Sequence, residues 1–278
     1  MTLNAINNTL FVGNVWYHFD SLHSTNDLAL NWLSQKPNKS FDLATPKPSF
    51  SLPITEGVVL TTFNQTLGRG QMGNQWLAEP HKNIAFTVIL FPTFLEAREQ
   101  FHLNKSIALA VHDCMSNIFQ TYNPALAHGC TVKWANDLYF YDQKLGGILI
   151  QNALAGSRLQ HTVAGIGLNI NQLDFPKDLN VTSLKRELKM DFDLFVLVEQ
   201  LAKCIELRYL ELKKGHFKRL HDEYLSKMYR FEKESLFQYP TGEVFRGTIV
   251  GVSEFGRLEI LTTEGVKSFD IKEVKFVI

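Results

Sequence analysis

The sequence lacks the features that would assign it to a charged, membrane-bound or secreted class of proteins. Lysine and arginine together number 28, and aspartate and glutamate also number 28, so no net charge recruits nucleic acid or a membrane surface. The start of the chain has no basic stretch followed by an apolar core, and no apolar run approaches the length that spans a bilayer. These absences predict a soluble, cytoplasmic protein in which any anion site is local.

Cysteine and histidine are too scattered to indicate a disulfide framework or a metal centre. The three cysteines, Cys114, Cys130 and Cys204, form no C-x-x-C pair, which favours reduced thiols. The nine histidines include no H-x-H or H-E-x-x-H motif, so we expect no metal site built by the protein. With 278 residues, of which 45% are hydrophobic, the chain can bury one large core and add a small second domain.

Hydrophobic periodicity predicts alternating strands and helices over most of the chain. Short apolar or β-branched runs predict strands at 11–19, 57–63, 83–91, 131–134, 146–151 and 161–170. Apolar residues at helical spacing predict helices at 28–33, 104–119 and 191–224, the last as one long amphipathic helix. Ser24 to Asp27 offer caps for the first helix, and the proline-rich segment 36–53 is expected to be a surface loop.

The pattern changes near residue 226 to short β-branched stretches separated by glycines. The stretches are 243–250, 257–262, 266–271 and 274–278, with turns expected at Gly242, Gly251, Gly256 and Gly265. This spacing predicts a small antiparallel barrel of about fifty residues. We therefore predict two domains, 1–226 and 227–278.

The stretch QTLGRGQMGNQW, residues 65–76, has three glycines at the spacing of a dinucleotide-binding fingerprint. That fingerprint needs a helix that opens directly from the loop, whereas here a further strand is expected to follow. The companion H-R-D and D-F-G motifs of a kinase are also missing. Arg69, between Gly68 and Gly70, could hold a carboxylate or phosphate, and the alternative is a solvated arginine in a surface hairpin.

Three further clusters combine polar side chains with glycine or a strand end. Lys133-Trp-Ala-Asn-Asp137 groups a base, an aromatic ring, an amide and an acid, although a turn beside a core tryptophan would explain it equally well. Lys144-Leu-Gly-Gly places a lysine before two glycines that allow close approach of a ligand to the backbone. Gly165-Ile-Gly-Leu-Asn-Ile-Asn ends an apolar strand in two amides. Each cluster is a weak signal by itself.

Together and in this order, the clusters resemble the motifs of the biotin protein ligases. The matching motifs are a Ser-Thr-Asn opening at Ser24, G-R-G-x-x-G-x-x-W from Gly68, K-W-x-N-D from Lys133, K-x-x-G-I-L from Lys144 and G-x-G-x-N from Gly165. The resemblance covers nearly the whole chain. It implies a mixed-sheet α/β catalytic domain of the biotin/lipoate ligase type and a small C-terminal SH3-like β-barrel.

The resemblance also implies a reaction and roles for individual residues. Biotin and ATP, with Mg²⁺, would give biotinyl-adenylate, and biotin would then pass to a lysine of a biotin carboxyl carrier protein. Arg69 and Lys144 would offset the repulsion between the two anions, and Asp137 would hold or deprotonate the acceptor lysine. The expected biotin-binding residues are Ser24, Thr25, Asn26, Gln65, Gly68, Arg69, Gly70, Gln71, Trp134, Lys144, Gly147 and Leu149. The expected adenylate-binding residues are Arg69, Gln71, Trp76, Asn136, Lys144 and Asn169.

The chain departs from the family pattern in two ways. The common family loop carries further arginines where this chain has Gln71 and Asn74, so we expect the adenylate to be held less tightly. The motifs begin about twenty residues into the chain, which leaves no room for the N-terminal DNA-binding domain of some members and predicts no nucleic-acid partner.

Two alternative functions and the oligomeric state stay open at this point. A lipoate or octanoate ligase shares the fold, although Ser24, Thr25 and Gln65 favour the polar ureido ring of biotin. A non-catalytic biotin or nucleotide sensor would be expected to lose Lys144 or Asp137, and both are present. The sequence allows either a monomer or a homodimer.

Overall fold

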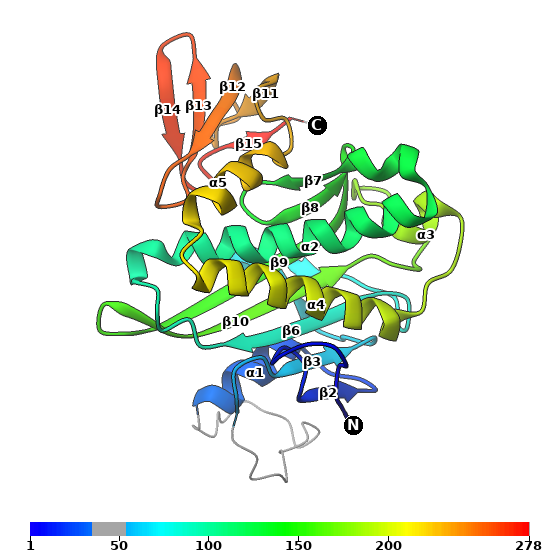
Figure 1. Cartoon of the computed structure of the whole chain (residues 1–278). Helices are drawn as coiled ribbons and strands as arrows, with labels where there is room; N and C mark the ends of the chain where they lie inside the picture. The colour runs from blue at the N-terminus through cyan, green and yellow to red at the C-terminus, as the bar shows by residue number, and fades with distance from the viewer. Residues whose placement is uncertain (35–53, 278) are drawn as a thin grey trace.

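The computed structural model describes residues 1–34 and 54–277 and contains a large mixed sheet with helices on both faces (Figure 1). The sheet has eight strands in the order β1-β2-β3-β6-β10-β9-β8-β7, and every neighbouring pair is antiparallel except β2 with β3. The strands are Thr2–Asn4 (β1), Trp16–Phe19 (β2), Val59–Thr62 (β3), Ile84–Leu90 (β6), Cys130–Lys133 (β7), Asp137–Phe140 (β8), Gln143–Ala155 (β9) and Arg158–Leu168 (β10). The expected mixed α/β class is confirmed, whereas the proline-rich segment 36–53 lies outside the described residues.

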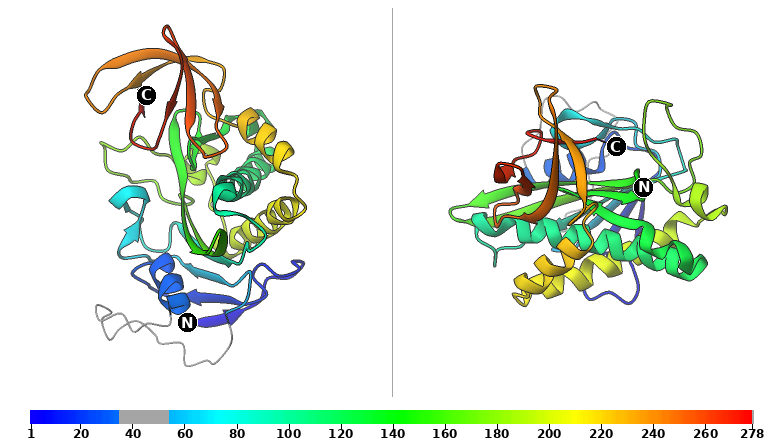
Figure 2. Two further views of the ribbon diagram at one scale, coloured as in Figure 1. Left: turned by 90° about the vertical axis from the view of Figure 1, so that its left-hand side faces the viewer. Right: turned by 90° about the horizontal axis from the view of Figure 1, so that it is seen from above.

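Alternating side chains divide the sheet into two faces with separate cores. Val59 and Val88 belong to the larger core, which α2 and α4 cover, while Leu60 and Ile89 point the other way toward α1. Figure 2 shows α2 and α4 side by side along one face of the sheet. The α-helices are Thr25–Ser34 (α1), Gln100–Tyr122 (α2), Leu184–Leu188 (α3), Leu194–Lys213 (α4) and Phe217–Ser226 (α5), with short 3-10 helices at Gln71–Gly73, Ala97–Glu99 and Pro124–Gly129.

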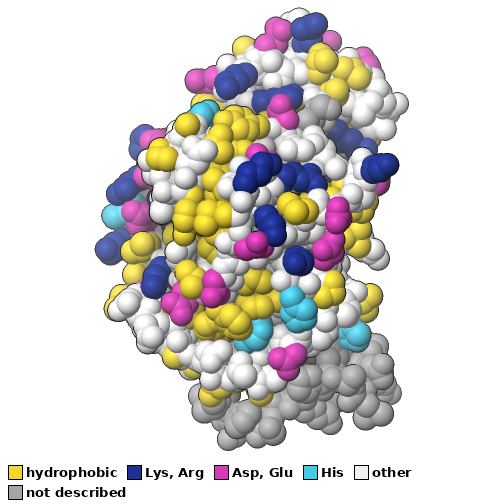
Figure 3. Space-filling view, turned by 90° about the vertical axis from the view of Figure 1, so that its right-hand side faces the viewer, with side chains coloured by type: hydrophobic (Ala, Val, Ile, Leu, Met, Phe, Trp, Pro, Cys, Tyr) yellow, Lys and Arg dark blue, Asp and Glu magenta, His cyan; other side chains and the backbone are white. Residues whose placement is uncertain are grey.

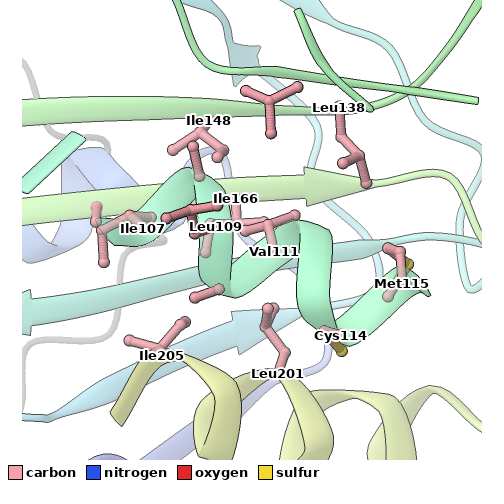
Figure 4. Packing of buried hydrophobic residues seen from close by; sticks show 14 of the residues in the cluster. Ile107, Leu109, Val111, Cys114, Met115, Leu138, Ile148, Ile166, Leu201 and Ile205 are labelled. Atoms are coloured by element: carbon pink, nitrogen blue, oxygen red, sulfur yellow. The ribbon is translucent and has the colours of Figure 1, made fainter. Parts of the chain in front are cut away.

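Helix α2 is buried on most sides because it packs against the sheet and against α4, its neighbour on the same face. In Figure 4, Ile148 and Ile166 of the sheet lie on one side of α2, and Leu201 and Ile205 of α4 lie on the other. The expected helix over 104–119 is confirmed and extends further in both directions. This closely packed layer supports the strands whose opposite face carries the cavity described below.

The prediction of one long helix over 191–224 is wrong. Helix α4 ends at Lys213, and Gly215 has a φ of +76°, a left-handed conformation that glycine adopts without the strain of a Cβ. Helix α5 then begins at Phe217 in a new direction. The apolar period continued across the break, so periodicity alone did not reveal it.

The prediction of a first strand over 11–19 is correct only for its second half. Residues 10–12 form a turn instead, because the buried Glu206 carboxylate accepts hydrogen bonds from the backbone N–H groups of Leu10, Phe11 and Val12 at 2.7–3.0 Å. Strand β1 at the edge of the sheet was not predicted. Its few residues carry no strong alternating pattern.

The C-terminal residues form a second sheet of five antiparallel strands, in the order β14-β13-β12-β11-β15. The strands are Glu234–Gln238 (β11), Val244–Val252 (β12), Leu258–Thr262 (β13), Gly265–Phe269 (β14) and Lys275–Phe276 (β15). The antiparallel arrangement is confirmed, but β14 and β15 stay the outer strands, so the pairings of the described residues do not close the expected barrel. Gly251 was expected in a turn and instead lies within β12, at a shift of register.

The second sheet packs directly on the first sheet and its helices. The indole Nε1 of Trp134 donates to the Gly256 carbonyl oxygen at 2.9 Å, and a Cβ at Gly256 would overlap the ring of Phe101. Residues of both sheets share one apolar core. We propose the domain boundary after Ser226, where α5 ends and the chain crosses to the second sheet.

Candidate active site

A cavity lies on the sheet face opposite α2 and α4, between the start of α1 and the glycine-rich loop. Twelve of its lining residues were expected from the sequence: Ser24, Thr25, Asn26, Gln65, Arg69, Gly70, Gln71, Trp76, Asp137, Lys144, Gly147 and Leu149. Seven others were not predicted as site residues: Asn74, Gln75, Ala85, Ile148, Gly165, Ile166 and Gly167. The glycines among the seven stand within a motif that the sequence analysis noted, so the motif was a usable signal for them.

The glycine-rich loop is a small hairpin that forms one wall of the cavity. Strands β4 (Gly68–Arg69) and β5 (Gln75–Trp76) pair antiparallel, and Gly70 N donates to Asn74 O at 2.7 Å. A Cβ at Gly68 would overlap the carbonyl oxygen of Trp76, so the close pairing requires glycine there. No α-helix opens from the loop, which confirms that it is not a dinucleotide-binding turn.

Trp76 lies against strand β10, where a glycine makes room for it. A Cβ at Gly167 would come within 2.6 Å of the Trp76 ring. The indole Nε1 is buried and has no hydrogen-bond partner among the described residues. A buried unpaired donor is costly, so this N–H is available to a polar group of a ligand.

Arg69 extends from the hairpin to the first turn of α1. Its Nε lies 3.1 Å from Asp27 Oδ2, and its side chain stays 64% exposed. Burial raises the pKa of Asp27, and the guanidinium partly opposes that effect. Asp27 was expected only as part of the helix cap and not as a site residue, although its place three residues after Ser24 was a signal for a carboxylate at a helix N-terminus.

Lys144 and Asp137 form an ion pair on the opposite wall. Lys144 Nζ lies 2.7 Å from Asp137 Oδ1, and each side chain is about one-third exposed. A Cβ at Gly147 would lie 3.2–3.3 Å from both charged groups, so this glycine gives them room. Residues 180–182 fix the backbone of Lys144, because Lys144 N donates to Asn180 O and Thr182 N donates to Lys144 O.

Four expected ligand contacts lie outside the cavity, and the side chains of three of them are used elsewhere. Trp134 is buried against the second sheet, where it donates to Gly256 as described above. Asn136 Nδ2 donates to the Ile148 carbonyl oxygen at 2.6 Å, and Asn169 Nδ2 donates to the Thr182 carbonyl oxygen at 3.0 Å. Both amides support backbone beside the cavity rather than line it. Gly68 also lies behind the wall.

Charge is concentrated locally although the chain is neutral overall. Lysine and arginine side chains gather near the middle of one face, with acidic side chains at their border (Figure 3). Near the cavity, burial lowers the pKa of Lys133 to about 8, and its Nζ donates to the Tyr139 hydroxyl at 2.9 Å. Within residues 1–34 and 54–277, no three His, Cys, Asp or Glu side chains gather as a metal site.

No helix among the described residues has both the length and the apolar character needed to cross a membrane.

Comparison with known proteins finds a similar family, similar sequences and similar structures. Residues 45–169 match the model of the biotin/lipoate A/B protein ligase family. The bifunctional ligase/repressor BirA of Bacillus subtilis is 27% identical over 218 residues, which cover 76% of this chain and 64% of that protein. The biotin–[acetyl-CoA-carboxylase] ligase of Mycobacterium tuberculosis is 26% identical over 203 residues, which cover 73% of each chain.

Solved structures share the fold. A biotin protein ligase from Aquifex aeolicus in complex with biotin and ATP has a TM-score of 0.70 and 24% sequence identity, with 94% of this chain and 99% of that chain covered. Residues 45–169 of this chain are therefore similar to the biotin/lipoate A/B protein ligase family, and the relatives that the chain matches include biotin protein ligases.

Proposed function

We propose that the protein is an ATP-dependent ligase that activates biotin as biotinyl-adenylate and transfers it to a lysine of a biotin carboxyl carrier protein. The observation that carries this proposal is that Arg69 and Lys144, which are far apart in the sequence, line the same cavity. The polar groups of Thr25 and Gln65 line it as well. One cavity thus combines two cations with donors and acceptors for a neutral ring.

In the first step a carboxylate oxygen of biotin attacks the α-phosphorus of ATP. The new oxygen–phosphorus bond replaces the bond to the bridging oxygen of the β-phosphate, and pyrophosphate leaves. Both reactants are anions, so Arg69 and Lys144 stabilise the charge that builds up where they meet. We assign the unpaired Trp76 indole N–H to a polar group of the adenylate.

In the second step the amine of the acceptor lysine attacks the acyl carbon of biotinyl-adenylate. An amide bond forms, the acyl–oxygen bond breaks and AMP leaves with the electron pair. The amine must first lose a proton, and the Asp137 carboxylate beside Lys144 is the group that we assign to hold or deprotonate it. The Lys144 ammonium contacts the acyl and phosphate oxygens in both steps.

Mg²⁺ is expected to arrive with the triphosphate. The described residues offer no group of three metal-binding side chains, so the phosphate oxygens would supply most of its ligands. When bound, the ion neutralises phosphate charge. The protein's own contribution is the pair Arg69 and Lys144.

The test is biotin-dependent exchange of labelled pyrophosphate into ATP, with lipoate and octanoate as control substrates. We expect exchange with biotin and none with the two controls. Exchange with lipoate or octanoate alone would identify a lipoate-type ligase, and binding of biotin without any exchange would identify a sensor. Transfer of labelled biotin to a purified carrier domain, compared with a carrier that has Arg at the acceptor lysine, tests the second step.

A further inference from the structure

A chain of buried polar side chains connects the sheet to Thr25, and its middle member, Asn26, also lines the cavity. It runs from β9 through Asn26 to Thr87 of β6 and ends at the Thr25 hydroxyl. Thr87 is fully buried and does not line the cavity. Its hydroxyl lies 2.7 Å from Asn26 Oδ1 and 2.8 Å from Thr25 Oγ1.

A backbone carbonyl fixes the orientation of the Asn26 amide. Asn26 Nδ2 lies 3.3 Å from the Leu149 carbonyl oxygen and 3.3 Å from Gln151 Oε1. A carbonyl can only accept, so the amide nitrogen faces β9 and Oδ1 faces Thr87. Gly165 of β10 leaves the space for this amide, because a Cβ there would overlap Asn26 Oδ1.

That orientation sets the direction of the two hydroxyl hydrogen bonds. A hydroxyl carries one proton, and Asn26 Oδ1 can only accept, so Thr87 donates its proton to Asn26. The Thr25 proton then has two acceptors, Thr87 Oγ1 at 2.8 Å and Gln65 Oε1 at 3.3 Å, and the shorter contact assigns it to Thr87. Thr25 lines the cavity with no proton left for a ligand, so its oxygen acts there as an acceptor.

Gln65 supplies a donor beside this acceptor. Gln65 Oε1 accepts from the Thr25 backbone N–H at 3.0 Å, so its Nε2 is turned the other way, toward Gly68. An acceptor oxygen next to an amide donor matches a cyclic urea, which presents an N–H and a C=O on neighbouring atoms. A dithiolane ring or an alkyl end presents neither group.

We propose that Thr87 is a specificity-determining positioning residue that, through Asn26 and Thr25, makes this end of the cavity select ligand head groups with an N–H donor. This inference deepens the proposed biotin ligase function and rests on it. The Thr25 hydroxyl cannot rotate to donate. A ligand that lacks the N–H therefore binds more weakly, because it leaves this buried acceptor unpaired.

The test compares Thr87→Val, which keeps the shape and removes the hydroxyl, with Thr87→Ser, which keeps the hydroxyl. Binding of biotin, and of desthiobiotin, which retains the urea but lacks the sulfur ring, is measured by calorimetry, and the KM for ATP is measured by pyrophosphate exchange. We expect Thr87→Val to weaken both ligands equally, by about 10- to 100-fold, with the KM for ATP unchanged. Thr87→Ser is expected to stay within about threefold of the wild type.

Two results would overturn the inference. One is equal biotin affinity in wild type and Thr87→Val. The other is an increase in the KM for ATP as large as the loss of biotin affinity, which would indicate general disorder of the site. If Thr87→Val does not fold, Thr87→Ala removes the same hydroxyl from a residue that does not line the cavity and should give the same selective loss. A wild-type chain that neither binds biotin nor catalyses exchange rejects the proposed function together with this inference, whereas an active wild type with an unchanged Thr87→Val rejects the inference alone.

Discussion

The Lys144 ammonium lies 2.7 Å from the Asp137 carboxylate, and the two groups share the space that Gly147 leaves open. The pair therefore joins the cation assigned to the first step with the carboxylate assigned to the second. When Lys144 turns to an anionic intermediate, Asp137 loses its partner and becomes available to the amine of the acceptor. The two steps are thus linked through one contact.

Replacing Lys144 with methionine should slow adenylate formation far more than it weakens biotin binding. The ammonium stabilises charge that exists only as the anions meet, so its loss lowers kcat by about 10²- to 10³-fold while biotin affinity changes little. Pre-steady-state formation of labelled adenylate and calorimetric biotin binding measure the two quantities. Lys214→Met, at the exposed end of α4, is the control and should behave as wild type. A large loss of biotin affinity with unchanged kcat would contradict this assignment.

Asp137→Asn should separate the two steps. Adenylate formation is expected to continue, because the asparagine still contacts Lys144, while transfer to the carrier slows by about 10²- to 10⁴-fold from loss of the base. Single-turnover transfer from preformed adenylate measures the second step, and pyrophosphate exchange measures the first. Raising the pH should partly restore transfer, since more of the acceptor amine is then neutral. Equal losses in both assays would show that Asp137 acts only by positioning Lys144.

Gln71→Arg should slow the escape of biotinyl-adenylate. Gln71 lines the cavity within the hairpin, so an added guanidinium there would pair with the adenylate phosphate. The release rate of labelled biotinyl-adenylate is expected to fall by about 10-fold or more relative to wild type. Gln75→Arg places a guanidinium elsewhere in the same hairpin, so it tests whether the slower release depends on the position of residue 71. Equal release from wild type and Gln71→Arg discards the idea that this loop holds its intermediate weakly.

Glu206→Gln should destabilise the fold without changing the site. The carboxylate accepts from three backbone N–H groups at residues 10–12, and a glutamine amide can satisfy fewer of them. We expect the free energy of unfolding to fall by about 1–3 kcal/mol in urea titrations. Glu199→Gln, on the same helix but without such a partner among the described residues, is the control. Biotin affinity at low temperature should stay at the wild-type value.

The contact between α2, α5 and the second sheet should weaken in acid. Burial is the main cause of the lowered pKa values of His102 and His221, and the nearby Lys105 lowers them further. Below their ordinary pKa of 6.5 the unfolded chain therefore binds protons that the folded histidines resist, so stability is present above that pH and is lost as the pH falls.

The measurement is urea unfolding of wild type and of the double variant His102→Gln, His221→Gln at about pH 7.5 and about pH 5.5. Wild type should lose more stability between these two conditions than the variant, because the variant keeps only the contributions of the other titratable groups, among them His18 and His161, whose pKa burial also lowers. Identical losses would exclude the two histidines as the cause.

Local signals in the sequence accounted for most elements and for many of the lining residues. Glycine beside Arg69 and Lys144 indicated close approach to the backbone, and hydroxyl and amide groups at Ser24 to Asn26 indicated a helix cap. Both kinds of signal depend on neighbours in the chain, so the sequence carries them directly. The helix break at Gly215 was missed because the apolar period on either side of it continued without interruption.

Contacts between distant segments depended on the tertiary structure. Trp134 and Asn136 stand in the same motif as Asp137, yet only Asp137 lines the cavity, because side chains alternate between faces and the chain turns between two strands there. The same holds for Asp27 beneath Arg69 and for Thr87 behind Thr25. The sequence by itself determined which chemical groups are present and which helices and strands carry them. Strand register and helix packing decided which of those groups meet, because a shift of one residue reverses the face of the sheet on which a side chain lies.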